Sequence, residues 1–320
     1  MRALRFERYG TADVLRVEEV SEPLPRPGEA KVRVRAAALN PLDWKVRAGD
    51  LRLIPLFRGP PRGLGCDFAG EIVGIGGGAT ERHVGERVLG SLLPFARDGA
   101  LAESIVVGYD RLLPIPDGID DTVAAALPVA GGTALQALVD EAGTVAGQRV
   151  LVNGAAGGVG HFAVQIAKHL GTYVVGVCSE GNADFVRGLG AHEVIDYARE
   201  DFTMRNERFD VVFDVAATSS FDAAKRVLTD FGCYINTGPT AAAIATTVMS
   251  AVIARFTSRQ RAVPLVLRNA PPLWHRVAQL VQSGAMRAHI ERTITLDDVA
   301  EAQRVMEAGH GRGKIVVQMR

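Results

Sequence analysis

The chain has 320 residues, of which 36 are basic and 36 acidic, so its formal net charge is zero. This balance gives no electrostatic reason to expect nucleic acid or an anionic membrane surface as a partner. Its three cysteines, Cys66, Cys178 and Cys233, are scattered without CxxC spacing, which argues against a disulfide framework and a structural zinc site. The amino-terminal "MRALRFERYG" has no apolar stretch typical of a signal peptide, and we expect a cytoplasmic protein.

The first third of the chain predicts β structure. Residues 31–40, "KVRVRAAALN", alternate apolar and polar side chains before a run of small ones, which is typical of a half-buried strand. Residues 70–76, 85–91 and 102–108 are short β-branched runs bounded by glycine. We therefore expect a glycine-rich antiparallel barrel.

From about residue 120 the pattern changes to alternating helices and strands. Residues 122–142 indicate a helix with one proline interruption. Apolar strands then alternate with amphipathic helices as far as residue 238, which favours an α/β fold with a parallel, doubly wound sheet. Residues 241–254, "AAAIATTVMSAVIA", form the longest mostly apolar stretch and are too short to span a bilayer, so we expect a buried or surface helix.

The stretch "VLVNGAAGGVG", residues 150–160, lies between a predicted strand and a predicted helix. Ala155, Gly157 and Gly160 fit A-x-G-x-x-G, a variant of the dinucleotide-binding fingerprint. Without Cβ atoms the backbone can approach a pyrophosphate closely, and the N–H groups at the start of the helix face its negative charge. The alternative is a tight strand-to-helix turn without a ligand.

The end of the following strand, "VCSEG", bears on the choice of nicotinamide cofactor. A carboxylate there hydrogen-bonds the ribose of NAD and repels the 2′-phosphate of NADP. Ser179 and Asn182 are small and polar, as suits a phosphate, whereas Glu180 counts against one unless it is a solvated loop charge. We expect NADPH, with NADH as the alternative.

Several stretches, in this order, together resemble the zinc-independent quinone oxidoreductase branch of the medium-chain dehydrogenase/reductase superfamily. They are "LNPLDWKVRAG", "GCDFAGEIVGIGGG", "GERVLG", "ALPVAGGTALQAL", "VLVNGAAGGVGHFAVQIAKHLG", "LGAHEVIDY" and "GRGKIVV". "NPLDWK" and "CSEGNADFVRGLGAHEVIDY" are most similar to the plant chloroplast-envelope quinone oxidoreductase and alkenal reductase group. The resemblance implies a GroES-like β-barrel domain (1–120 and 285–320) and a Rossmann domain (121–284).

The resemblance also implies that no zinc is bound. Zinc alcohol dehydrogenases of the superfamily place a cysteine after the first barrel strand and a His-Glu pair in a "GHE" motif, whereas this chain has "LNPLD" and "GCDFAG". A cluster of Cys66, Asp67 and His83 is the remaining metal alternative, and it does not complete a tetrahedral set of nitrogen and sulfur ligands.

The implied reaction is hydride transfer from NADPH to a small apolar electrophile, a quinone or an α,β-unsaturated carbonyl. By position in the motif, Asn40 would donate a hydrogen bond to the substrate oxygen, Lys45 would stabilise the oxyanion, and Asp43 would orient Lys45. The alternatives are that Asp43 caps a turn and that Lys45 is a solvated lysine.

On the cofactor side, the resemblance implies Thr133 at the nicotinamide ribose or amide and backbone contacts of Ala156, Gly157, Gly158 and Val159 to the pyrophosphate. Further matching positions are Ser179, Asn182 and Tyr197 at the 2′-phosphate and Lys314 near the cofactor cleft, or Lys314 as a surface charge. Gly181 departs from the closest group, in which a basic residue is common there.

Three functions remain open at this point. The first is an NADPH-dependent quinone or enone reductase, expected as a homodimer. The second is a nucleotide-binding regulatory or structural protein without turnover, and the third, disfavoured, is a zinc alcohol dehydrogenase.

Overall fold

The computed structural model describes residues 1–52, 59–92, 96, 98–238, 259–309 and 311–319. The predicted helix at 241–254 lies outside these residues. The chain divides into two compact units, the first comprising Met1–Gly132, Asn269–Gly284 and Ala288–Arg320 and the second Thr133–Arg268 and Ala285–Arg287. Each is described below by itself.

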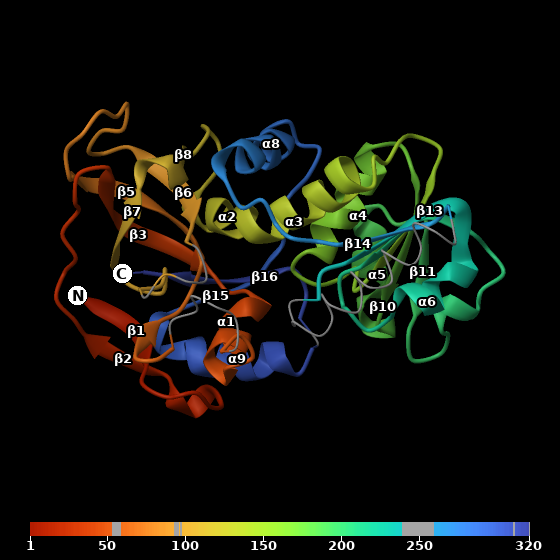
Figure 1. Cartoon of the computed structure of the whole chain (residues 1–320), viewed down its shortest axis with the longest axis horizontal. Coiled ribbons are helices and arrows are strands. Elements are labelled where there is room, and N and C mark those ends of the chain that lie inside the picture. Colours follow the sequence, from red (N-terminus) through yellow and green to blue (C-terminus); the bar gives the residue numbers. More distant parts are fainter. Residues whose placement is uncertain (53–58, 93–95, 97, 239–258, 310, 320) are drawn as a thin grey trace. The chain divides into compact units, whose positions relative to one another are not determined.

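The first unit is built on two sheets (Figure 1). In the described residues the larger has seven strands. Six of them follow in the spatial order β15 (Ile290–Ile294), β16 (Lys314–Gln318), β3 (Glu29–Ala38), β5 (Asp67–Ile75), β6 (Arg87–Ser91) and β8 (Leu112–Pro114). The seventh, β7 (Ser104–Gly108), pairs with β3. The smaller has the order β2 (Arg16–Glu19), β1 (Arg2–Phe6) and β4 (Arg62–Gly63). Apart from the parallel pair β15–β16, the pairings are antiparallel.

The four strand runs predicted in the first third are confirmed as β3, β5, β6 and β7. β3 alternates buried and more exposed residues before ending in three buried alanines, Ala36–Ala38. Its buried side, with Phe68 and Ile72 of β5, belongs to one apolar core that also includes Phe6 and Leu101. The antiparallel β architecture predicted here is therefore present.

Helices and short helical turns complete the first unit. They are η1 (Ala12–Val14), α1 (Pro41–Ala48), η2 (Tyr109–Arg111), α2 (Asp121–Ala126), η3 (Leu127–Gly131), α8 (Pro271–Gln282), η8 (Leu296–Asp298) and α9 (Val299–Glu307).

The placement of α2 and α8 in the first unit differs from the predicted boundaries at 120 and 284. α8 packs on η3 and β8. The indole Nε1 of its fully buried Trp274 donates to Asn269 Oδ1 at 2.8 Å, and the Arg111 guanidinium lies over the indole ring.

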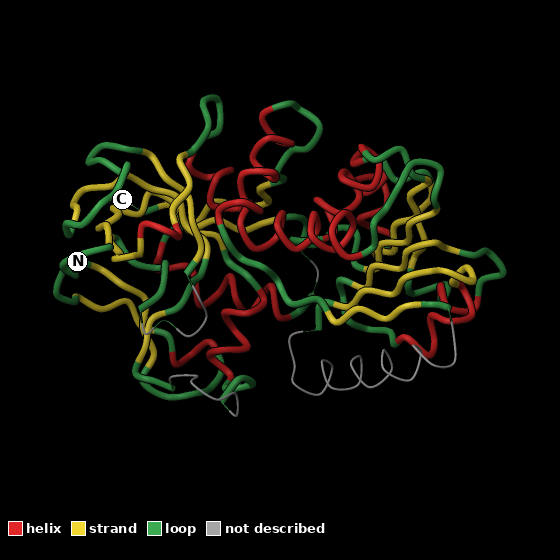
Figure 2. Tube along the Cα trace, turned by 45° about the horizontal axis from the view of Figure 1, so that its top comes forward, coloured by secondary structure: helices red, strands yellow, loops and turns green. Residues whose placement is uncertain are grey.

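The second unit holds a six-stranded, wholly parallel sheet, as predicted. Its strands follow in spatial order: β11 (Glu193–Asp196), β10 (Tyr173–Cys178), β9 (Arg149–Asn153), β12 (Phe209–Asp214), β13 (Leu228–Asn236) and β14 (Arg261–Pro264). Strand order reverses between β9 and β12, which is where an open α/β sheet forms its ligand crevice. The strands lie side by side in Figure 2.

Helices connect these strands in the second unit. They are α3 (Gly132–Leu135), η4 (Gln136–Glu141), α4 (Gly160–His169), η5 (Glu180–Asn182), α5 (Ala183–Leu189), η6 (Phe202–Met204), α6 (Phe221–Ala224) and η7 (Lys225–Val227). α4 packs against α5, and η6 packs against η7. The crossovers from β9 to β10 and from β12 to β13 run in opposite directions across the sheet, so right-handed connections place these two groups on opposite faces.

One helical run among the described residues, Asp121–Glu141, is long and apolar enough to cross a membrane by length and composition alone. In its most apolar window, 78% of the residues are buried inside the protein. Such burial is what a core helix of a globular protein shows, so the run is weak evidence for a membrane span.

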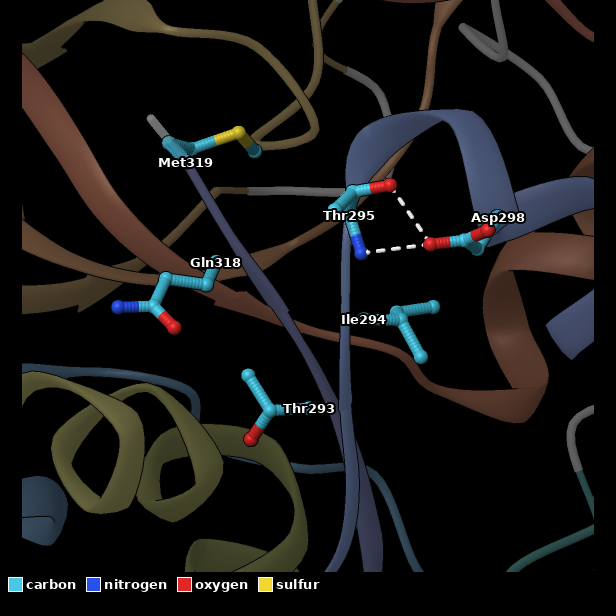
Figure 3. A pocket seen from close by; sticks show the side chains of 6 residues that line it. All are labelled: Thr293, Ile294, Thr295, Asp298, Gln318 and Met319. Carbon is cyan, nitrogen blue, oxygen red and sulfur yellow. Dashed lines mark hydrogen bonds between the residues drawn. The ribbon is translucent and has the colours of Figure 1, made fainter.

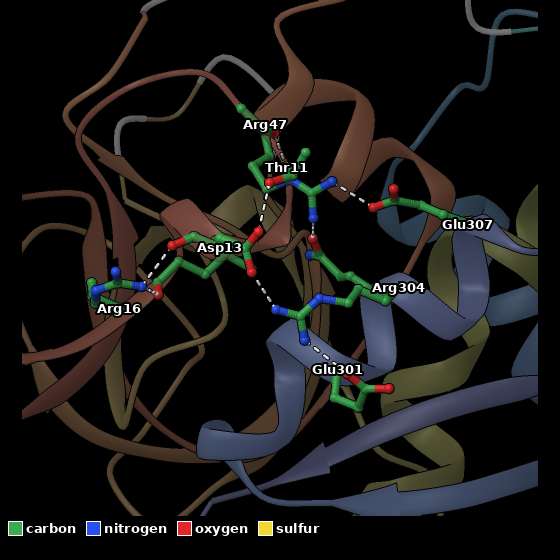
Figure 4. Close-up of polar contacts among 10 residues, drawn as sticks. Thr11, Asp13, Arg16, Arg47, Glu301, Arg304 and Glu307 are labelled. Atoms are coloured by element: carbon green, nitrogen blue, oxygen red, sulfur yellow. Dashed lines mark hydrogen bonds and ion pairs between the residues drawn. The ribbon is translucent and has the colours of Figure 1, made fainter.

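A polar network joins α1, α9 and the η1 region of the first unit (Figure 4). The guanidinium of Arg47, which is 1% exposed, donates to Gly10 O at 3.1 Å, to Gln303 Oε1 at 2.6 Å and to Glu307 Oε1. Arg304 of α9 donates to Asp13 and Glu301 on the exposed side of the same network. A buried, fully engaged arginine of this kind ties elements that are far apart in the chain.

We predict that Arg47→Met lowers the free energy of unfolding by about 2–4 kcal/mol, because Gln303 and Gly10 lose a buried donor. The matched variant Arg304→Met removes an exposed guanidinium from the same network and should change stability little. Urea unfolding, followed by fluorescence and calorimetry, measures both variants. Equal effects of the two substitutions would contradict the role assigned to Arg47.

Candidate functional site

A cluster of polar side chains lies inside the first unit, at the end of β3. Asn40 follows this strand in an extended conformation, and Pro41 begins α1. The backbone N–H of Asn40 donates to Asp43 Oδ2 at 2.7 Å, so Asp43 caps the first turn of the helix. Lys314 of β16 and Asp67 of β5 complete the cluster, and each of these four residues is at most 3% exposed.

The Lys314 ammonium is hydrogen-bonded inside this cluster. It donates to Leu39 O at 2.7 Å and to Asn40 Oδ1 at 2.6 Å. The Asn40 amide nitrogen donates to Asp67 Oδ2 at 3.0 Å and to Ala38 O at 3.3 Å. Asp67 Oδ2 also accepts from Val129 N at 3.3 Å.

Burial dominates the electrostatics of the cluster. It raises the pKa of Asp43 to about 7, against the partial opposition of the Asn40 N–H and the Lys314 charge. It also raises the pKa of Asp67 and lowers the pKa of Lys314. The pKa of the neighbouring Cys66 thiol lies well above its ordinary value, first because of burial and then because of the two carboxylates.

These contacts bear on the roles predicted for α1. Both hydrogens of the Asn40 amide donate within the protein, so donation to a substrate oxygen, which stays a prediction, requires one of these bonds to be exchanged. Asp43 accepts a hydrogen bond from the Asn40 backbone N–H, which is the contact expected if Asp43 caps the turn. Lys45 is half-buried, and burial lowers its pKa. The structure gives no contact between Asp43 and Lys45 through which Asp43 would orient the lysine.

Metal binding has little support among the residues that the structure describes. None of them form a group of three or more His, Cys, Asp or Glu side chains suited to a metal ion. His83 lies 3.6 Å from Glu86 with 74% of its side chain exposed, whereas Cys66 and Asp67 are buried.

The glycine turn of the second unit joins β9 to α4. The N–H groups of Gly154 and Ala155 both donate to Val177 O, which fixes the turn against β10. A Cβ at Gly160 would lie 2.0 Å from Gly154 O, so packing alone requires this glycine. A Cβ at Gly157 would meet no atom closer than 3.5 Å, so the protein's own packing does not account for Gly157.

The amides that follow Gly157 are available to a ligand. Within the described part of the chain, the N–H groups of Gly158 and Val159 have no hydrogen-bond acceptor. Free amides at the start of a helix bind phosphate oxygens. This geometry suits a pyrophosphate, and the binding predicted for residues 156–159 stays a prediction.

Three further predicted cofactor residues come together at the ends of β10 and β11. The Asn182 amide donates to Ser179 Oγ at 3.2 Å, and Tyr197 N donates to Cys178 O at 3.2 Å. Tyr197 is 57% exposed, whereas Asn182 is 9% exposed.

The other two predicted cofactor residues are placed differently. Thr133 is 7% exposed within α3. Lys314 belongs to the first unit, and its ammonium is engaged in the buried cluster.

A cavity of about 620 Å³ lies at the carboxyl edge of the parallel sheet. Its lining consists of Asn153, Val177, Tyr197, residues 200–203, residues 218–220 and Ala223. Three of the lining residues, Val177, Phe202 and Ala223, are apolar and suit the face of a flat base such as adenine, whereas the other eight are polar.

The floor of this cavity is held by Asp214, which the sequence analysis did not single out. Its carboxylate accepts from the Asn153 amide, the Ser219 N–H and the Tyr234 hydroxyl at 2.8–2.9 Å. Ala217, in the loop after β12, has φ 54°, a left-handed conformation that a non-glycine residue rarely adopts. A polar residue at the end of an apolar strand was the available signal in the sequence.

A second cavity, of about 390 Å³, lies beside β15 and β16 of the first unit (Figure 3). Its lining is Thr293, Ile294, Thr295, Asp298, Gln318 and Met319. Asp298 accepts from Thr295 N at 2.9 Å and from Thr295 Oγ1 at 2.6 Å, as a helix-capping residue does. The residues that line it include no lysine, arginine, histidine or cysteine.

Comparison with known proteins gives consistent matches over the whole chain. A family model for the alcohol dehydrogenase GroES-like domain matches residues 26–117, and one for zinc-binding dehydrogenases matches residues 189–317. The chain is 34% identical to the chloroplastic quinone-oxidoreductase homolog of Spinacia oleracea, covering 99% of this chain and 98% of that protein. It is 30% identical to 2-methylene-furan-3-one reductase of Solanum lycopersicum, covering 99% and 79%.

Among solved structures, the quinone oxidoreductase from Coxiella burnetii is similar to this one with a TM-score of 0.89 and 31% identity. The match covers 100% of this chain and 99% of that one. Together with the parallel six-stranded sheet, it confirms the predicted fold class, a GroES-like domain with a Rossmann-type domain.

We predict that Gly157→Ala leaves the melting temperature nearly unchanged but weakens dinucleotide binding about tenfold or more, because the new methyl group enters the space over the turn. Thermal unfolding with and without NADPH measures both effects, since a ligand of the folded state raises the melting temperature. As the control, Gly160→Ala should lower the melting temperature without any ligand. An undiminished NADPH-induced shift in Gly157→Ala would argue against the site.

The buried carboxyl of Asp43 predicts a dependence of stability on pH. Its pKa is about 7 in the folded protein, against 3.8 for an ordinary carboxyl. Between these values the folded protein keeps a proton that the unfolded chain has released, so this group's contribution to stability decreases as pH rises from about 4 to about 7. Asp43→Asn removes that contribution, and its melting temperature relative to the unmodified chain should therefore rise over this range.

Melting curves at a series of pH values measure the difference. Asp50→Asn, at an exposed position just after the same helix, is the control and should show a constant difference. A constant difference for Asp43→Asn as well would mean that Asp43 is already ionised at low pH.

Proposed function

We propose a reaction for this chain from one premise: it belongs to the quinone oxidoreductase group of the medium-chain dehydrogenase/reductase superfamily. The proposed reaction is the NADPH-dependent reduction of a quinone or an α,β-unsaturated carbonyl. Relatives similar over nearly the whole chain include a quinone oxidoreductase homolog and a furanone reductase, whose names cover both acceptor classes.

One observation carries the proposal. The turn after β9 leaves open space over Gly157 and presents the N–H groups of Gly158 and Val159 without partners among the described residues. The cavity at the same edge of the sheet has room for an adenine base, with the apolar side chains Val177, Phe202 and Ala223 in its lining. When bound there, NADPH would supply a hydride for an electron-poor acceptor.

We assign the stabilisation of the oxyanion and the positioning of α1 to residues of this chain. The half-buried Lys45 ammonium is our candidate for stabilising an oxyanion, because a cation partly withdrawn from water acts more strongly on a developing charge. Asn40 and Asp43 hold the start of α1, and Asp43 keeps a proton on its carboxyl up to about pH 7. The substrate proposed is a small apolar electrophile.

We further propose that catalysis does not use zinc. The Lys314 ammonium is buried beside Asp43, Asp67 and Cys66, and a fixed cation there opposes the binding of a divalent ion. Burial raises the pKa of the Cys66 thiol, which disfavours the thiolate that zinc requires.

Steady-state oxidation of NADPH and of NADH, with a panel of quinones and enones, tests the function. We expect turnover with NADPH by protein that metal analysis finds free of stoichiometric zinc. Tight dinucleotide binding without turnover of any acceptor would favour a regulatory or structural nucleotide-binding protein. Stoichiometric zinc with alcohol oxidation would favour a zinc alcohol dehydrogenase.

We predict that Lys45→Met lowers kcat about tenfold to a hundredfold, because one charge is lost from the oxyanion site. The Kd for NADPH should stay unchanged, since the nucleotide turn is in the other unit. Lys31→Met, which removes a partly buried lysine that pairs with Glu22, is the control and should keep full activity. An unchanged kcat in Lys45→Met would leave Lys45 as a surface lysine.

We also propose a cytoplasmic homodimer that neither binds nucleic acid nor spans a membrane. Three free, buried cysteines suit a reducing compartment. Within the described part of the parallel sheet, β14 is an edge strand, and a second copy pairing with it would extend the sheet. Sedimentation equilibrium gives the mass that tests the dimer.

A further inference from the structure

We propose that Arg199 determines the choice of NADPH over NADH by binding the 2′-phosphate in exchange for its ion pair with Glu180. The inference rests on the proposed function. It assigns a role to a residue that neither the sequence pattern nor the resemblance singled out, and it answers how a phosphate could be accepted beside an acidic side chain.

The sheet register brings Arg199 to this place. β10 and β11 are parallel neighbours, with Cys178 opposite Asp196, so the loops that follow them lie side by side. Arg199 Nη2 donates across the two loops to Glu180 Oε1 at 2.9 Å and Oε2 at 2.8 Å. Its Nε lies 3.5 Å from Asp196 Oδ2.

The same two loops carry the polar residues expected at an adenosine ribose. Ser179 and Asn182 are joined by the hydrogen bond described above, and Tyr197 is held to the end of β10 by its backbone N–H. Tyr197 also lines the cavity assigned to the base. Arg199 is two residues further along the chain, at the edge of that group.

One nitrogen of the Arg199 guanidinium can take a further hydrogen-bond acceptor. Its Nη1 makes no hydrogen bond with any residue that the structure describes, while Nη2 and Nε face carboxylates. Gly181 leaves room in the loop, since a Cβ there would meet no atom within 4 Å. Arg199 could therefore reach a phosphate at this loop from the neighbouring one.

The exposure of the ion pair favours the exchange of Glu180 for a phosphate at the Arg199 guanidinium. The side chains of Arg199 and Glu180 are 71% and 69% exposed, and water screens an ion pair that exposed, so it adds little to stability. A guanidinium that binds a phosphate in bidentate fashion makes shorter and stronger bonds to a group of higher charge. The phosphate therefore displaces or shares Glu180 at little cost.

Without Arg199 this corner of the unit would be acidic. Glu180 and Asp196 both contact Arg199, and the adjacent Glu200 is paired with Arg205. A further cation of this region, Arg187 of α5, is paired with Asp184. Removal of Arg199 thus leaves two carboxylates close to the proposed phosphate, and their repulsion adds to the lost attraction.

The test measures Kd for NADPH and for NADH by titration calorimetry with the full chain. Arg199→Ala should weaken NADPH binding about tenfold to a hundredfold and leave NADH binding within about twofold. Glu180→Ala should strengthen NADPH binding, because it removes the competitor for the guanidinium. Arg187→Ala, which removes another largely exposed, paired arginine, is the control and should change neither Kd.

Two small probes isolate the phosphate. We expect 2′,5′-ADP to bind the unmodified chain more tightly than 5′-AMP does, and we expect Arg199→Ala to abolish the difference. An unchanged NADPH-to-NADH ratio in Arg199→Ala, with both dinucleotides still bound, would overturn this inference and leave the proposed function standing. Failure of the unmodified chain to bind either dinucleotide would instead overturn the proposed function, and this inference with it.

Discussion

The polar interior of the first unit depends on the buried ammonium of Lys314. It joins β16 to the corner between β3 and α1, since Lys314 donates to Asn40, which lies 274 positions earlier in the chain. Removing an ammonium from water costs several kcal/mol, and nearby carboxylates and carbonyl oxygens offset that cost only while all of them are in place. Asn40 can bridge Lys314 and Asp67 only because it offers an acceptor and a donor at once. The position of α1, and with it that of Lys45, follows from this arrangement.

In the second unit, the proposed ligand site is prepared by different means. The groups proposed to bind phosphate are backbone N–H groups, which carry no net charge and need no buried counter-ion. Among the described residues of this unit, the buried carboxylate is that of Asp214, which accepts three hydrogen bonds and so fixes the loop that contains the left-handed Ala217. The side chains proposed to distinguish one dinucleotide from another lie outside this rigid base, on exposed loops. Binding the pyrophosphate and choosing the cofactor are therefore separate properties, which substitutions can change independently.

Much of the fold could be predicted from the sequence, because its strands and helices have clear periodicity and its turns have glycine. β1, β2 and β15 were not predicted, because their charged residues obscure the strand pattern. The boundary at 120 was placed before α2, which packs on β3 and β5. At the site, the glycine turn and the group around Ser179 could be predicted from spacing. The hydrogen-bond partners of Lys314 and of Arg199 could not be predicted, because strand register brings these residues together and not their distance along the chain.

Three cations show how burial, more than residue type, sets what a charge can do in this protein. Lys314 is 3% exposed and its ammonium donates to two oxygens inside the protein, so it serves as a fixed part of the structure. Arg199 is largely exposed, and because water screens its ion pair, it can exchange one anion for another. Lys45 lies between these extremes, withdrawn enough from water to lower its pKa yet without a carboxylate that holds it in the described structure. A transient oxyanion requires that intermediate state, since a fully paired cation has no free capacity and a fully solvated one has little effect.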